Sequence, residues 1–132
     1  MSDPMAAMAE KPARYPYQAP IDAYGNGGFR FAEMSHRGSI LCLPSGIYAW
    51  DISGADAFSL DAFAQVFAEK ERIDFLLLGT GRTQIFPSRE IRNGFVAAGL
   101  GLEPMDTGAA CRTYNVLLAE HRRVAAALLA VD

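Results

Sequence analysis

The chain has 132 residues, of which 51% are hydrophobic and 20% charged, so it is expected to fold as one globular domain with an ordinary core. Its formal net charge of −3 argues against nucleic acid as a partner, because phosphate binding needs a concentrated cationic face. There is no run of roughly 18 apolar residues, so no helix is expected to span a membrane.

Residues 1–20 contain four of the seven prolines and show no helical or strand periodicity. Proline removes a backbone hydrogen-bond donor, so we expect a disordered or loosely docked tail over residues 1–20. Asp3 and Glu10 lie in this stretch without an apolar core, so it does not resemble a secretory signal. A single α/β domain is then expected over residues 21–132.

The first half of the domain reads as short strands separated by turn residues. The expected strands are residues 21–24, 29–31, 39–43 and 47–52. Gly25-Asn26-Gly27-Gly28 tolerates positive φ and predicts a hairpin between the first two strands. A second turn is expected at His36-Arg37-Gly38, and a third at Pro44-Ser45-Gly46. These strands predict an antiparallel component.

The second half alternates helical and strand periods. Helices are expected after the capping residues Ser59 and Ser88, and after Asp106 or Thr107, with Gly99 ending the second. The expected strands are residues 74–78 and 101–105. Residues 124–131 fit either a helix, by their alanines, or a buried strand, by their uninterrupted apolar character. The alternation predicts an α/β layer with some parallel strand pairing.

A glycine-rich loop after the uninterrupted apolar strand is the first candidate site. Gly79-Thr80-Gly81 lies where open α/β sheets bind ligands, and Arg82 adds a cation. The dinucleotide fingerprint fails because its third glycine would fall at Gln84, and no Lys–Ser/Thr pair makes a P-loop. The alternative is a tight turn that needs positive φ.

Polar residues in the first turns of the third helix form the second candidate. Arg112-Thr113-x-Asn115 is a poor choice for a core stripe and a good choice for anchoring a neighbouring loop. We expect these residues to meet the Gly79–Gly81 loop, either to bond its carbonyl groups or to form a shallow polar site for an anion or a peptide.

No catalytic, metal or cofactor motif is found. His36 and His121 have no second His or Cys at ligand spacing, so no metal site is expected. No serine has the context of a catalytic elbow. Cys42 and Cys111 are too few for a disulfide framework, so we expect both to be reduced, Cys111 to lie on the inner stripe of its helix, and the location to be cytoplasmic.

Three segments together resemble a known family. They are Leu43-Pro44-Ser45-Gly46-Ile47-Tyr48-x-Trp50, Leu76-Leu77-Leu78-Gly79-Thr80-Gly81 and Glu103-x-Met105-x-Thr107, followed by the run from Ala109 through Cys111-Arg112-Thr113-Tyr114-Asn115 to Leu128. Their order is similar to that in the uncharacterised prokaryotic protein family that includes mitochondrial respiratory complex I assembly factor 3. The resemblance covers roughly residues 20–130 and is most specific in the C-terminal third.

The resemblance implies a three-layer α/β fold around a central mixed sheet, with the last segment a strand. Mitochondrial members resemble adaptors that bind protein partners during assembly of a membrane complex, and no catalytic residues are established for the family. The positions that match its motif are Gly79, Gly81, Arg112, Thr113 and Asn115. His121 stands where the family pattern has glycine.

Two hypotheses about function follow. The first is a non-catalytic accessory factor that binds a protein partner, with peripheral association with a membrane complex and no cofactor. The second is an enzyme, or a protein that binds a small molecule or anion through the Gly79–Gly81 loop and Arg112. A deep polar pocket at Arg112 would favour the second hypothesis, and an apolar surface patch would favour the first.

Overall fold

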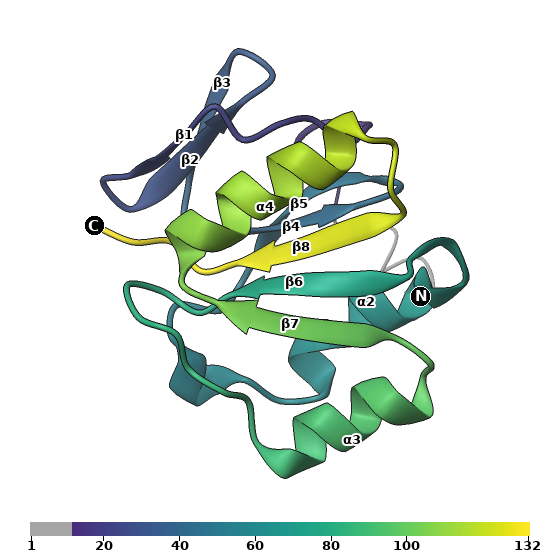
Figure 1. Cartoon of the computed structure of the whole chain (residues 1–132). Coiled ribbons are helices and arrows are strands. Elements are labelled where there is room, and N and C mark those ends of the chain that lie inside the picture. Colours follow the sequence, from purple (N-terminus) through teal and green to yellow (C-terminus); the bar gives the residue numbers. More distant parts are fainter. Residues whose placement is uncertain (1–11) are drawn as a thin grey trace, which may run out of the picture.

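The computed structural model describes residues 12–132 and shows a single α/β domain in three layers (Figure 1). A five-stranded mixed sheet has the strand order β5-β4-β8-β6-β7. Helix α4 and a three-stranded antiparallel sheet cover one face, and α2 and α3 cover the other. The expected mixed sheet with a separate antiparallel component is confirmed.

The elements have the following bounds. The strands are β1 (Ala23–Gly25), β2 (Gly28–Phe31), β3 (Met34–Arg37), β4 (Ser39–Leu43), β5 (Gly46–Trp50), β6 (Phe75–Gly79), β7 (Gly101–Met105) and β8 (Val124–Leu128). The helices are α2 (Ala64–Ala68), α3 (Arg89–Ala97) and α4 (Thr107–Ala119), with 3-10 turns η1 (Ala55–Ala57), η2 (Asp61–Phe63) and η3 (Lys70–Arg72). Strand β6 is parallel to both β7 and β8, and β4 is antiparallel to both β5 and β8.

The three-stranded sheet begins with the expected hairpin. Asn26 and Gly27 have φ of 52° and 80°, the two positive values of a type I′ turn. The turn expected at 36–38 is wrong in part, because His36 and Arg37 belong to β3. The chain instead reverses between β2 and β3 at Ala32 and Glu33, with φ of 48° and 63°. Neither residue type marks such a turn in a sequence.

The helix expected after Ser59 is shorter than its apolar spacing indicates. The Ser59 Oγ accepts a hydrogen bond from the Ala62 N–H at 3.2 Å, but the backbone forms η2 and then only five residues of α2. Aromatic packing holds this irregular segment against the sheet. The Phe63 ring centroid lies 5.6 Å from that of Trp50 and 5.3 Å from that of Phe95.

Helices α3 and α4 begin at the expected caps. Ser88 and Asp106 accept hydrogen bonds from the N–H groups of Ile91 and Ala109, at 3.4 and 2.9 Å. Both helices end in the same motif, with a residue of positive φ after the last turn. That residue is Gly99 in α3, with φ 73°, and His121 in α4, with φ 60°.

Residues 124–131, whose sequence fits either a helix or a strand, form strand β8 over Val124–Leu128. All five of its residues are buried, and it lies between β4 and β6 in the centre of the sheet. Val124, Ala126 and Leu128 belong to the core under α4, whereas Ala125 and Ala127 belong to the core under α2 and α3. The final strand therefore supplies side chains to both cores.

The expected tail over residues 1–20 divides at residue 12. Residues 1–11 lie outside the described residues. Within residues 12–20, Tyr15 forms an antiparallel bridge to Ile47, and its carbonyl accepts from the Ile47 N–H at 2.9 Å. A Cβ on Gly46 would lie 2.5 Å from the Tyr15 carbonyl oxygen. A glycine after the β4–β5 turn therefore lets this segment lie against the edge of β5.

The cysteines are free and buried in the core under α4. Cys111 is on the buried side of its helix, as expected. Burial raises the pKa of the Cys42 thiol, and burial raises that of Cys111 to about 12 in spite of the nearby Arg112 charge. Burial also raises the pKa of Tyr114, which lies beside Cys42. These groups stay protonated in the folded protein at neutral pH.

Because the pKa values of the Cys42 and Cys111 thiols are raised in the folded protein, we expect the unfolding free energy to fall at alkaline pH. A raised folded pKa contributes stability below the unfolded pKa, near 9.0, and that stability is lost as pH rises toward the folded value. We expect each thiol to cost about 1 kcal/mol of unfolding free energy between pH 8 and pH 10. Urea unfolding across this range measures the loss. A C42A/C111A variant should show a flatter profile, and equal slopes would contradict the prediction.

The positive φ of His121 at the end of α4 indicates that a glycine there would stabilise the protein. A side chain at positive φ is strained, whereas glycine is not, so His121→Gly should raise the unfolding free energy by about 1 kcal/mol. This corresponds to a melting temperature higher by about 3 to 5 °C. Gly99→Ala, at the matching position of α3, should lower it. A His121→Gly variant with an unchanged or lower melting temperature would contradict the strain argument.

Candidate functional site

The Gly79–Gly81 loop lies at the carboxyl ends of three strands and is held by Thr107, the first residue of α4. The Thr107 Oγ1 donates to the Leu129 carbonyl at 2.8 Å and accepts from the Gly81 N–H at 3.0 Å. The Thr107 N–H donates to the Gly81 carbonyl at 2.8 Å. This side chain is fully buried, so one residue joins the ends of β6 and β8 to the start of α4.

Thr80 closes the same loop from within. Its Oγ1 donates to the Thr83 carbonyl at 2.6 Å and accepts from the Ile85 N–H at 3.0 Å, and its N–H donates to the Met105 carbonyl at 2.9 Å. The polar groups of the loop are thus used in internal hydrogen bonds. This arrangement matches the tight-turn reading, with Gly81 at φ 103°.

Gly79 is needed for the close approach of α4. A Cβ at this position would lie 3.1 Å from the Thr107 Cα and 3.0 Å from a Leu128 methyl group. Both distances are tighter than most real Cβ contacts, so a side chain at Gly79 would require Leu128 and the Thr107 backbone to shift by a few tenths of an ångström. Arg82, the remaining predicted residue of the loop, is exposed.

The predicted residues of α4 point to a different partner. The Asn115 amide accepts from the Ile21 N–H at 2.8 Å and donates to the Ile21 carbonyl at 2.9 Å. It therefore anchors the segment before β1 and not the Gly79–Gly81 loop. Arg112 is exposed beside Gly108, where the Tyr24 hydroxyl also lies, and Thr113 is half-buried.

The structure thus brings together only part of the predicted site. Gly79, Thr80 and Gly81 meet the start of α4, but within residues 12–132 no hydrogen bond joins Arg112 to their loop. The residue that sequence reasoning missed is Thr107. The sequence identified Thr107 only as a possible helix cap, because a threonine before a helix is typical of that role. Asp106 takes the capping role and leaves the Thr107 hydroxyl free to bond the loop.

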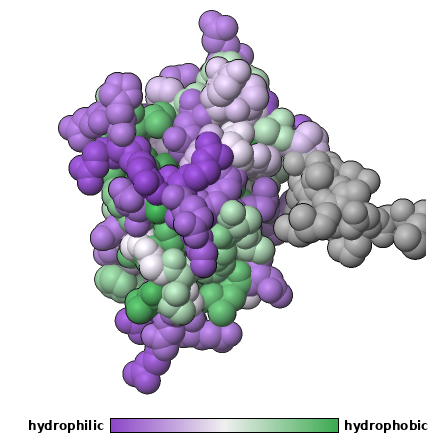
Figure 2. Space-filling model, turned by 90° about the vertical axis from the view of Figure 1, so that its right-hand side faces the viewer, coloured by the Kyte–Doolittle hydropathy of each residue, from purple (hydrophilic) through white to green (hydrophobic). Residues whose placement is uncertain are grey.

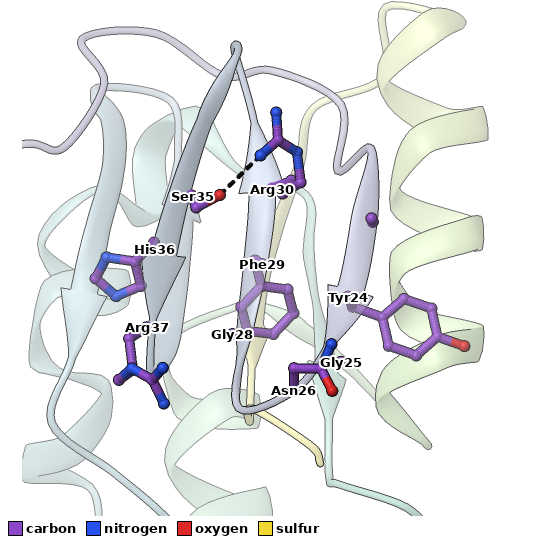
Figure 3. Close-up of a pocket in the computed structure, with 10 residues that line it drawn as sticks. Tyr24, Gly25, Asn26, Gly28, Phe29, Arg30, Ser35, His36 and Arg37 are labelled. Atoms are coloured by element: carbon purple, nitrogen blue, oxygen red, sulfur yellow. Dashed lines mark hydrogen bonds between the residues drawn. The ribbon is translucent and has the colours of Figure 1, made fainter.

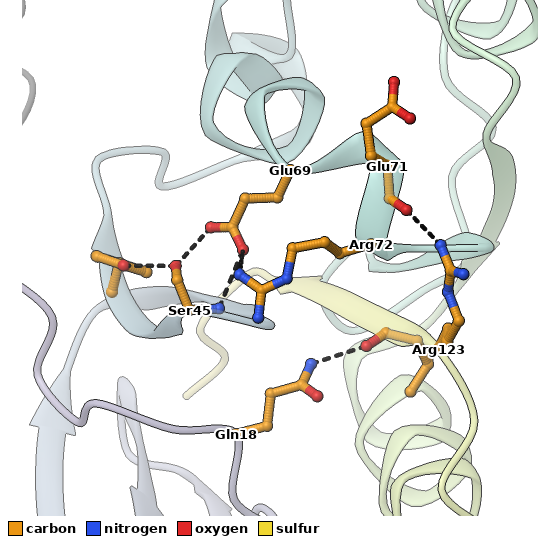
Figure 4. Close-up of polar contacts among 8 residues, drawn as sticks. Gln18, Ser45, Glu69, Glu71, Arg72 and Arg123 are labelled. Carbon is orange, nitrogen blue, oxygen red and sulfur yellow. Dashed lines mark hydrogen bonds and ion pairs between the residues drawn. The ribbon is translucent and has the colours of Figure 1, made fainter.

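A second polar cluster joins the β4–β5 turn to the end of α2 (Figure 4). The Glu69 carboxylate accepts from the Ser45 N–H at 3.0 Å and from the Ser45 Oγ at 2.5 Å. The Ser45 Oγ also lies 2.6 Å from the Tyr48 hydroxyl, and Arg72 lies 3.5 Å from the carboxylate. Every member has an internal partner, so this cluster clamps two elements together.

An apolar groove runs between the α2 region and α3. Its volume is about 540 Å³, and its lining residues are Leu60, Asp61, Ala64, Phe67, Lys70, Gly94, Ala97 and Ala98. Most are small or apolar, and the two charged residues are Asp61, the first residue of η2, and Lys70, the first residue of η3. In Figure 2 apolar atoms gather in the lower half of the molecule, at the height of α2 and α3 in Figure 1.

Metal and membrane features were also sought in the described part of the chain. Residues 12–132 contain no group of three or more His, Cys, Asp or Glu side chains placed to hold one metal ion. Among the same residues, no helix has the length and apolar character needed to cross a bilayer.

The fold is shared with a solved structure. A crystal structure described as an outer membrane protein from Bartonella henselae superposes with a TM-score of 0.87 at 50% identity, covering 90% of this chain and 100% of that one.

The sequence is similar both to an uncharacterised bacterial protein and to an assembly factor of NADH dehydrogenase. An uncharacterised protein of Rhodobacter capsulatus is 37% identical over 122 residues, which is 92% of this chain and 93% of the relative. The human NADH dehydrogenase (ubiquinone) 1 alpha subcomplex assembly factor 3 is 30% identical over 110 residues, or 83% of this chain. The matched region spans 59% of that human protein's length.

A family model described as a protein of unknown function (DUF498/DUF598) matches residues 21–129. This range includes the Gly79–Gly81 loop, Thr107 and Asn115, and it agrees with the resemblance found in the sequence. The protein therefore belongs to the DUF498/DUF598 family and is related to complex I assembly factor 3.

Proposed function

We propose that this protein is a non-catalytic accessory factor that binds an amphipathic helix of a protein partner in the groove between α2 and α3. The observation that carries the proposal is the contrast between two surfaces. The polar groups of the Gly79–Gly81 loop are bonded internally, whereas the groove presents exposed apolar and small side chains. An exposed apolar groove is typical of a protein-binding surface.

The shape of the groove favours a helix as its occupant. Ala64 and Ala97 are small and exposed, so a partner backbone can approach both walls closely, while Phe67 offers an aromatic contact. The stretch from Asp61 to Lys70 is about 13 Å long if it rises like a helix, which suits two to three turns of a partner. Asp61 at one end and Lys70 at the other favour a partner helix with a basic and an acidic end.

The relatives suggest what kind of partner carries this helix. One is named as an assembly factor of NADH dehydrogenase, and one solved structure is described as an outer membrane protein. We infer that the partner is a subunit of a respiratory or other membrane complex during assembly, which the protein joins by peripheral association. The cytoplasmic location stays a prediction.

The alternative use of the Gly79–Gly81 loop and Arg112 has less support. The loop amides and hydroxyls already have partners, so an anion would have to displace internal hydrogen bonds. Arg82, Arg112 and Thr113 remain candidate residues for such a site.

Site-specific photo-crosslinking tests the groove. A photo-reactive residue at Ala97, in the groove, should capture a membrane-complex subunit through an amphipathic helical segment, in cells that contain the native partners. The same residue at Val116, which is 57% exposed on α4, should not capture it. The purified segment should then bind the wild-type protein, and Ala64→Arg should weaken binding at least tenfold because it fills the groove with a charge.

Matched variants separate docking from folding. Val116→Arg adds the same charge on the opposite layer and should leave binding unchanged. Ala64 is exposed, so circular dichroism should show unchanged melting for Ala64→Arg. Equal capture from Ala97 and Val116, capture of only a second copy of this chain, or unchanged binding by Ala64→Arg would contradict the proposed function.

A further inference from the structure

A cavity on the three-stranded sheet is unrelated to the groove. Its volume is about 410 Å³, and it is formed by β1, β2, β3 and the turn between β1 and β2 (Figure 3). No carboxylate lines it, although acidic residues outnumber basic ones in the chain as a whole. Its charged residues are Arg30 and Arg37.

Strand register places both arginines on one face of this sheet. Arg30 lies opposite Ser35, and Gly28 lies opposite Arg37, so the two arginines are diagonal neighbours across β2 and β3. Such neighbours are about 7 to 8 Å apart at the backbone. The Arg30 guanidinium extends toward Ser35 and the Arg37 guanidinium lies near Gly27 of the β1–β2 turn, so the two charges stand at opposite ends of the cavity (Figure 3). A Cβ on Gly25 would meet nothing within 4 Å, so the cavity is open at this residue, whereas a Cβ on Gly28 would collide with the His36 carbonyl group.

The two guanidinium groups have unused hydrogen-bonding capacity. Both side chains are exposed, and neither forms an ion pair with any residue in the range 12–132. One Arg30 nitrogen, Nη1, donates to the Ser35 hydroxyl at 2.9 Å, which fixes the side chain and leaves further N–H groups free. The cavity therefore presents two cations and no carboxylate among its lining residues, which favours an anionic ligand.

We propose that this cavity binds a phosphorylated ligand through Arg30 and Arg37. Arginine presents its donors in a planar fork that matches phosphate oxygens in a bidentate way, and the Ser35 hydroxyl adds a further polar contact. The open space beside Gly25 leaves room for the group that carries the phosphate. That carrier is either a small phosphorylated molecule or the headgroup of an anionic phospholipid, which share the same recognised chemistry.

Titration with pyrophosphate and with vesicles distinguishes the two sources. Pyrophosphate at low ionic strength should shift the NMR amide signals of Gly25 and Gly28, and vesicles of phosphatidylglycerol should co-sediment with the protein where phosphatidylcholine vesicles do not. The R30Q/R37Q variant should bind at least tenfold more weakly. The control R89Q/R92Q removes two charges from α3 and should bind like the wild type.

Each result decides the proposal. Pyrophosphate binding that R30Q/R37Q abolishes supports a small phosphorylated ligand, and vesicle binding alone that the same variant abolishes supports a lipid headgroup. Because both arginines are exposed, the variant should keep the melting temperature of the wild type. Binding of neither probe, or equal binding of the probes by wild type and R30Q/R37Q, would overturn it.

Discussion

The buried hydroxyl of Thr107 is the contact on which the centre of the fold depends. It bonds the Leu129 carbonyl after β8 and the Gly81 N–H after β6, while the residue itself starts α4. Removing it would leave the buried Leu129 carbonyl without this partner, at a cost of about 1 to 3 kcal/mol, and would also free the half-buried Gly81 N–H. The bare Gly79 lets α4 come close enough for these bonds to form. A single polar residue thereby closes the edge of the sheet where related architectures bind ligands.

Strand β8 is the last strand in the sequence, yet it lies in the centre of the five-stranded sheet. It joins the antiparallel pair β4–β5 to the parallel pair β6–β7, so the five-stranded sheet is complete only when the last strand is inserted. Its three alanines are small because packed layers cover it on both faces. The same alanines made its periodicity ambiguous, since alanine also favours helix. Tertiary pairing with two neighbours, and not local propensity, fixes this segment as a strand.

Local signals predicted local structure, and long-range contacts were missed. Strand β4, the hairpin at Asn26-Gly27 and the caps at Ser88 and Asp106 follow from residue chemistry that acts over a few positions. The Asn115–Ile21 pair joins residues 94 positions apart, so its partner could not be read from the spacing. The candidate site shows the same limit. The residues of α4 that were expected to meet the loop are Arg112, Thr113 and Asn115, whereas the hydrogen bonds from α4 to the loop come from Thr107.

The two proposed binding surfaces lie in different layers of the molecule. The groove is formed by α2 and α3 on one side of the five-stranded sheet, and the arginine cavity belongs to the small sheet on the other side. No residue lines both, so a ligand in one leaves the other accessible. The rigid sheet between them, with both faces densely packed, holds the two surfaces at a fixed separation. Under the two proposals, the protein would hold a phosphate-bearing ligand and a partner helix at the same time, one on each side of the five-stranded sheet.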